Sequence, residues 1–211
     1  MALSGFTTAN YLTLPSAIIS AYPFTIAAWG NTSNNTAYNT LVNVNDAIIN
    51  AYHGLTFDGV AAGDPIQAFS GYGGVNGIAR TTTGYSLNTW VHGCGVFNAS
   101  NSRSAFINGG SKGTNTTNIT PSGIDRTSIG VFRATARFDP FQGSIAEVGI
   151  WNVALTDDEV LALAKGFTPD QIRPQSLIAY LPLVRTNQDI KGTAWTTAGT
   201  LTVANHPRIY T

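Results

Sequence analysis

The chain contains two glutamates, and their positions decide whether it could hydrolyse a glycosidic bond. Retaining hydrolysis needs two carboxyl groups about 5 Å apart, one as nucleophile and one as acid/base. Glu147 lies in an apolar run with no acidic residue two positions away, and Glu159 occupies a helix-capping position. Only folding could bring Glu147 a partner, for example Asp139. We therefore expect no catalytic residues and a protein that is not an enzyme.

Histidine and cysteine offer no catalytic or zinc motif either. His53, His92 and His206 are far apart in the sequence and lack the close spacing of zinc ligands. His92 lies on an alternating strand, which favours a hydrogen-bonded structural role. Cys94 shares the parity of that strand and has no cationic neighbour, so we expect a buried, unreactive thiol.

Loop aspartates leave calcium as an alternative, because calcium prefers hard oxygen ligands. The candidates are Asp46, Asp58, Asp64, Asp125 and Asp139. They are scattered along the chain, and aspartate in a loop more often stabilises a turn. The sequence therefore assigns no metal ligand and predicts no other cofactor.

Aromatic side chains are the remaining candidates, since sugars stack on aromatic faces. Tyr72 is flanked by glycines and is expected to be the best exposed, with Tyr52 and Trp195 as further stacking candidates. Trp29, Trp90 and Trp151 fall in hydrophobic strands. For these three we expect core positions with satisfied indole N–H groups.

The elements that must position these residues are mostly short strands separated by Gly-, Asn- and Ser-rich turns, as in a sandwich or barrel. The expected strands are 10–14, 24–29, 40–44, 48–57, 66–69, 90–97, 103–107, 127–132, 143–151, 176–183 and 200–203. Strand 143–151 is apolar on both faces, which predicts a central position. The last two strands are expected to rejoin one domain spanning 1–211.

One helix is well marked, at about 156–165. Thr156 and Glu159 form a capping box, and Leu155 with Val160 can form a hydrophobic staple. Gly166 and Pro169 end the helix. Its apolar stripe predicts docking on the sandwich.

Composition excludes several function classes. The formal net charge is zero and only 10% of residues are charged, so the electrostatic attraction that drives nucleic-acid binding has no source. No apolar run approaches the roughly 20 residues that span a bilayer, and the N-terminus lacks the pattern of a signal peptide. We therefore expect no nucleic-acid or membrane partner and synthesis in a cytosol.

The stretch 141–164, FQGSIAEVGIWNVALTDDEVLALA, resembles the laminin-G-like (concanavalin A-like lectin/glucanase) jelly roll. FTIAAW at 24–29, TWVHGCGVF at 89–97, SAFINGG at 104–110 and TSIGVF at 127–132 extend the resemblance. It implies an all-β fold: a two-sheet antiparallel jelly-roll sandwich with one short helix in its C-terminal half. The motif positions are Trp29, Trp90, Gly143, Glu147, Trp151 and Leu155. Ala146 stands where the family carries an aspartate.

The segment from Ile172 onward resembles the C-terminal part of laminin-G-like proteins of tailed bacteriophages. This implies a non-catalytic virion structural protein, foremost a capsid decoration or cement protein assembled in the bacterial cytoplasm. Its partners would be the major capsid protein or other virion proteins and, through edge strands, copies of itself. The alternative is a carbohydrate-binding adhesion module on a tail or fibre, which would bind surface glycans.

Overall fold

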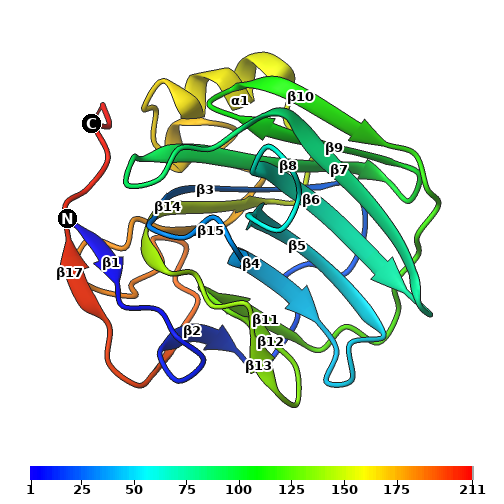
Figure 1. The fold of residues 1–211 in the computed structure, drawn as a ribbon, viewed down its shortest axis with the longest axis horizontal. Helices are drawn as coiled ribbons and strands as arrows, with labels where there is room; N and C mark the ends of the chain where they lie inside the picture. The colour runs from blue at the N-terminus through cyan, green and yellow to red at the C-terminus, as the bar shows by residue number, and fades with distance from the viewer. Residues whose placement is uncertain (211) are drawn as a thin grey trace.

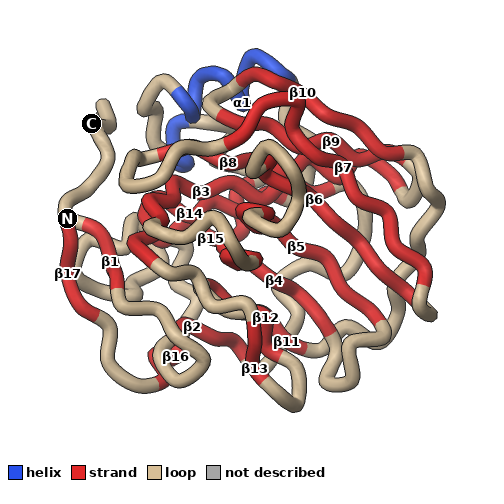
Figure 2. The backbone as a smooth tube through the Cα atoms, in the orientation of Figure 1, coloured by secondary structure: helices blue, strands red, loops and turns tan. Residues whose placement is uncertain are grey.

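The computed structural model describes residues 1–210 as two antiparallel β-sheets packed face to face, with one α-helix outside (Figures 1 and 2). Sheet A has the order β10 (Gly110–Asn115), β9 (Ser102–Ile107), β8 (Val91–Ala99), β3 (Phe24–Thr32), β14 (Gly143–Trp151), β1 (Ala2–Ser4) and β17 (Thr202–Ala204), and β15 (Leu177–Leu181) also pairs with β14. Sheet B has the order β16 (Thr196–Ala198), β2 (Tyr11–Leu14), β11 (Arg126–Ile129), β4 (Tyr38–Asn45), β5 (Ala51–Asp58), β6 (Pro65–Tyr72) and β7 (Val75–Gly84). The predicted all-β jelly-roll sandwich is confirmed.

Three further elements lie outside the two sheets. A small hairpin, β12 (Phe132–Arg133) with β13 (Arg137–Phe138), follows β11. The helix α1 (Asp157–Ala164) has the predicted capping box between Thr156 and Glu159. A short 3-10 helix, η1 (Pro169–Gln171), leads back to sheet A through β15.

Apolar side chains form three separate clusters. The largest fills the space between the sheets and includes the fully buried Phe24, Ile26 and Phe57. A second lies between the outer face of sheet A and α1, where Val160 and Leu163 meet Trp151. The third is on the outer face of sheet B, and its buried members are Phe69, Phe132 and Ala134. The apolar side chains of this third cluster point away from the main core, so packing between the two sheets does not account for them.

The strand predictions miss β7 and begin β5 too early. β7 is ten residues long but was not predicted, because its inward positions carry Gly77, Ala79 and Thr81, which give no hydrophobic alternation. β5 begins at Ala51, and Ile48, which was assigned to this strand, lies before it with 76% of its surface exposed.

The C-terminal segment returns to the sandwich. β15 and β17 belong to sheet A and β16 to sheet B, and the two chain ends lie on the same side of the molecule (Figure 1). Within residues 1–210, the structure contains no helix with the length and apolarity needed to cross a membrane.

Candidate functional site

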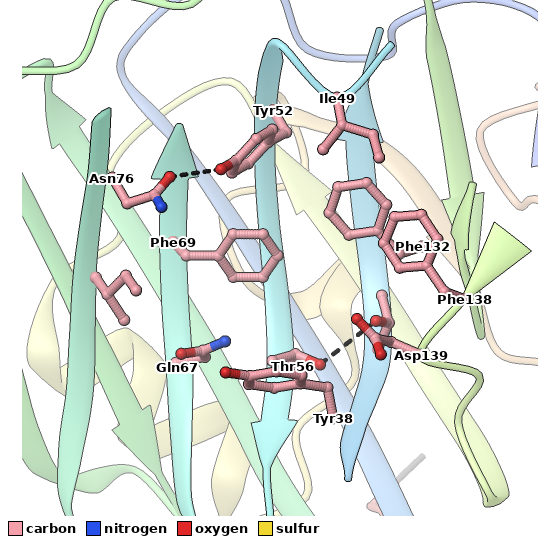
Figure 3. Close-up of a pocket in the computed structure, with 12 residues that line it drawn as sticks. Tyr38, Ile49, Tyr52, Thr56, Gln67, Phe69, Asn76, Phe132, Phe138 and Asp139 are labelled. Atoms are coloured by element: carbon pink, nitrogen blue, oxygen red, sulfur yellow. Dashed lines mark hydrogen bonds between the residues drawn. The ribbon is translucent and has the colours of Figure 1, made fainter. Parts of the chain in front are cut away.

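A groove with a cavity volume of about 220 Å³ lies on the outer face of sheet B (Figure 3). β4, β5, β6 and β7 form its floor, and the β12–β13 hairpin forms one wall. Its lining residues are Tyr38, Thr40, Ile49, Tyr52, Thr56, Gln67, Phe69, Asn76, Ile78, Phe132, Phe138 and Asp139. The volume is below the roughly 300–1,000 Å³ of pockets that enclose drug-sized ligands. It suits a single ring of a larger ligand.

The floor is built from two matching segments of neighbouring strands. Tyr52 and Gly54 lie two residues apart on β5, and Phe69 and Gly71 lie two residues apart on β6. The register places Tyr52 opposite Gly71 and Phe69 opposite Gly54. A Cβ on Gly71 would lie 2.1 Å from Tyr52 Cζ, and one on Gly54 would lie 2.4 Å from Phe69 Cζ. Each ring therefore lies across the glycine opposite it, where any larger residue would displace it.

The hairpin supplies the aromatic wall. The Phe132 and Phe138 rings are stacked with centroids 4.7 Å apart, and Phe132 meets Tyr52 edge to face at 5.7 Å. Asn45 Nδ2 donates to the Arg133 carbonyl at 2.7 Å and fixes the hairpin to β4. The wall thus depends on contacts between segments almost ninety residues apart in the sequence.

One end of the groove is polar. Figure 3 shows Gln67, Thr56 and Asp139 there, with Tyr52 and Ile49 at the opposite end. Gln67 is only 6% exposed, and its side-chain Oε1 has no hydrogen-bond partner among the described residues. Buried polar atoms are normally paired. A hydrogen-bond donor on a bound ligand would satisfy this amide oxygen.

Of the three predicted stacking residues, one lines the groove. Tyr52 is half-buried there, and its hydroxyl donates to Asn76 Oδ1. Burial raises the pKa of Tyr52, an effect that the Asn76 hydrogen bond partly offsets. Tyr72 is 36% exposed but lies outside the groove, at the end of β6, where its hydroxyl accepts a hydrogen bond from Ser122. The structure therefore separates these two tyrosines.

The prediction for Trp195 as a stacking platform is corrected. Trp195 is only 6% exposed and packs in the main core, and its indole N–H donates to Asp189 at 3.3 Å. A ring this buried is not available for stacking.

Of the three tryptophans expected in the core, Trp151 is confirmed there, and the assignments of Trp29 and Trp90 are corrected. Trp151 is fully buried, and its indole donates to the Ile172 carbonyl. Trp29 and Trp90 are partly exposed. Trp29 lies on the outer face of β3 against His92, and Trp90 precedes β8 instead of belonging to it. The other motif residues are structural: Gly143 pairs with Thr32 at the start of β14, and Leu155 packs under α1.

Glu147 is buried on β14 and is not among the residues that line the groove. Its Oε2 accepts the Tyr180 hydroxyl at 2.6 Å, and its Oε1 lies 3.1 Å from His206 Nε2. Asp139 lines the groove on sheet B, whereas Glu147 belongs to sheet A and is enclosed by the C-terminal segment. The structure does not bring these two carboxylates into one site.

The Glu147–His206 pair predicts a pH-dependent stability. Burial lowers the pKa of His206, but the Glu147 carboxylate and the Pro207 carbonyl raise it, and the net shift is upward from 6.5. A histidine whose pKa is higher in the folded state than in the unfolded state contributes its full stabilisation at pH values below the unfolded-state pKa. This contribution is lost as the pH rises through the folded-state pKa. His206→Asn should therefore destabilise the protein more at about pH 6 than at about pH 9. Urea unfolding at both pH values tests this, and an equal loss at both would contradict it.

The other titratable candidates have structural environments. Burial lowers the pKa of His92 to about 3, and burial together with Arg103 does the same for His53. Cys94 is fully buried, which raises the pKa of its thiol.

The aspartates weighed as calcium ligands are dispersed. Asp58 pairs with Arg80, and Asp125 with Arg126. Asp46 accepts the backbone N–H of Asn50, Asp64 accepts Asn35 Nδ2, and Asp139 lies in the groove. Residues 1–210 contain no group of three or more His, Cys, Asp or Glu side chains that could hold a metal ion.

The two antiparallel sheets packed face to face define a jelly-roll sandwich. Residues 6–161 match the laminin-G-like model of the concanavalin A-like lectin/glucanases superfamily. The chain belongs to this family. A comparison with curated protein sequences gives no significant match.

Solved structures share the fold. A heptameric SAP-like pentraxin from Limulus polyphemus has a TM-score of 0.68 at 12% identity, covering 97% of this chain and 94% of its own. Domain 4 of a GH43 extracellular arabinanase from Geobacillus stearothermophilus, solved with arabinotriose, has a TM-score of 0.60 at 23% identity, covering 73% and 72%. Tailspike protein 2 of an Escherichia coli O157:H7 bacteriophage has a TM-score of 0.60 at 14% identity, covering 87% of this chain and 27% of its own.

Proposed function

We propose that this protein is a non-catalytic carbohydrate-binding module whose groove on sheet B holds one sugar ring of a glycan. The observation that carries the proposal is an aromatic cluster outside the main core that surrounds a hollow with the unpaired Gln67 oxygen at its polar end. Apolar walls with a few placed polar groups are typical of small-ligand sites. The related arabinanase domain, whose structure contains arabinotriose, supports this assignment.

Two features support binding without hydrolysis. Asp139 is the only carboxylate among the described residues that line the groove, and retaining hydrolysis needs a second carboxyl about 5 Å away. The other candidate carboxylate, Glu147, is engaged by Tyr180 and His206. Incubation of the protein with the glycans it binds should therefore leave them intact by mass spectrometry.

Tyr52→Ala should weaken glycan binding at least about tenfold, because it removes the largest ring that is open at the apolar end of the groove. Tyr72→Ala is the matched control, since Tyr72 is also partly exposed on sheet B but lies outside the groove. A glycan array identifies the ligand, and calorimetry on both variants measures the affinity, with calcium and with EDTA. Equal losses in the two variants, or no glycan bound by the parent protein, would refute the proposal.

We also propose that the module functions on a bacteriophage particle, either as a capsid decoration protein or on a tail or fibre. The resemblance of the segment from Ile172 to phage laminin-G-like proteins and the tailspike relative support this location. Assembly in the bacterial cytoplasm and self-association through the edge strands β16 and β17 belong to the same proposal. Mass spectrometry and electron microscopy of purified particles test it. Absence of the chain from the particles would exclude this location without affecting the groove.

A further inference from the structure

We propose that Asp139 makes the groove selective by charge, so that it accepts neutral or amine-bearing sugars and rejects sugars that carry a carboxylate. This inference rests on the proposed function and specifies its ligand class. It depends on the charges of the lining residues and on the position of one side chain.

The groove lining has one charged side chain. Asp139 supplies a carboxylate, and no Lys, Arg or His is among the described residues that line the hollow. Arg137, two residues before Asp139 in the chain, donates through its Nε to the Tyr11 hydroxyl at 2.9 Å. On sheet B, Arg80 lies opposite Gln67 in the β6–β7 register. Arg80 Nε is 2.9 Å from the fully buried Asp58 carboxylate. It is therefore already neutralised by a carboxylate of its own and does not offset Asp139.

The Asp139 carboxylate also lacks a protein partner. No hydrogen bond or ion pair is formed by its side chain within the described residues, although its backbone carbonyl accepts the Thr40 N–H at 3.2 Å. Partial burial raises the pKa of this carboxyl, with no compensating cation. A desolvated carboxylate of this kind repels a second carboxylate and accepts hydrogen bonds from hydroxyl or ammonium groups.

The polar end is thus arranged for a donor-rich ligand. Gln67 Oε1 and the Asp139 carboxylate are both acceptors without partners. Neutral sugars bring hydroxyl donors to these atoms while an apolar ring face meets Tyr52 and Phe69. Two unit charges about 5 Å apart at an effective dielectric of about 20 repel each other. This repulsion energy is larger than the free-energy difference that corresponds to a tenfold change in affinity. Charge selection therefore follows from one residue.

Asp139→Asn is a suitable test because it preserves the backbone. Asp139 has φ 51, in the left-handed region, and asparagine tolerates that region as well as aspartate does. Asp158→Asn is the charge-matched control, since Asp158 is exposed on α1 at a distance from sheet B. Circular dichroism and thermal melting verify that both variants are folded.

The probes are matched immobilised glycans: galactose-terminated and galacturonate-terminated chains, and chains ending in glucosamine with a free or an acetylated amine. The parent protein should bind neutral and free-amine chains at least about tenfold more tightly than galacturonate-terminated chains. Asp139→Asn should reduce this ratio to near unity, and Asp158→Asn should leave it unchanged. Two results would overturn the inference and leave the proposed function intact. One is binding that depends on Tyr52 but does not discriminate between neutral and galacturonate-terminated chains, and the other is an affinity ratio that Asp139→Asn does not change. No binding to any probe would overturn both.

Discussion

Gly71→Ala is expected to abolish most of the glycan affinity, although Gly71 has no side chain that could contact the glycan. An added Cβ would lie 2.1 Å from Tyr52 Cζ and 2.2 Å from Tyr52 Cε2, so the ring must leave its position across the strand pair. Gly54→Ala should act in the same way on Phe69, whose Cζ would be 2.4 Å from the new methyl group. We expect at least about a tenfold loss in each variant, equivalent to about 1.4 kcal/mol of binding free energy. Calorimetry with the glycan identified on the array gives the measurement.

The fold should survive both substitutions. The atoms closest to the new methyl groups belong to the Tyr52 and Phe69 side chains on the outer face of sheet B, and the nearest backbone atom to the Gly54 Cβ is Val42 O at 3.1 Å. Alanine in a strand recovers roughly 0.5–1 kcal/mol of the entropic cost of glycine. Gly110→Ala is the control, because its Cβ would meet nothing within 4 Å. Binding that persists at the parental level in folded Gly71→Ala and Gly54→Ala would show that the two rings do not form the ligand floor.

Much of the fold could be predicted from local patterns, and the groove could not. The run from Gly143 to Trp151 is apolar on both faces, and the structure places it centrally in sheet A as β14. The capping residues around α1 are equally local. Tyr52 was selected only as an aromatic residue, whereas its importance arises from the register that sets it opposite Gly71. Register between strands depends on distant pairing and is not encoded in the spacing within either strand.

The remaining members of the groove illustrate the same limit. Phe69 reads as an ordinary strand residue, and Phe132 and Phe138 lie in a hairpin too short to give a periodic signal. In the sequence, Asp139 cannot be distinguished from the other four loop aspartates. Only the folded hairpin places it at the polar end of the groove. A weak local signal did exist: the Tyr52–Gly54 and Phe69–Gly71 pairs repeat an aromatic residue followed two positions later by glycine. That repeat acquires meaning only when β5 and β6 are known to pair.

Trp151→Ala is expected to cause the largest loss of stability. The side chain is fully buried at the end of β14, its ring lies across Gly149, and it packs with Val160 and Leu163 beneath α1. Truncation of a buried tryptophan costs about 3–5 kcal/mol, since the cavity cannot collapse fully. For a chain of this size, this corresponds to a fall in Tm of roughly 6–20 °C. Urea unfolding followed by circular dichroism measures the change in the free energy of unfolding.

Trp151→Phe separates packing from hydrogen bonding at the same position. Phenylalanine retains most of the contact with the α1 cluster but leaves the Ile172 carbonyl, now 2.7 Å from the indole nitrogen, without its donor. The expected loss is smaller, about 1–3 kcal/mol. Because this cluster and the groove lie on the outer faces of different sheets, the folded fraction of either variant should bind glycan with parental affinity. Loss of binding in proportion to stability would instead mean that sheet A and its helix hold the groove in shape.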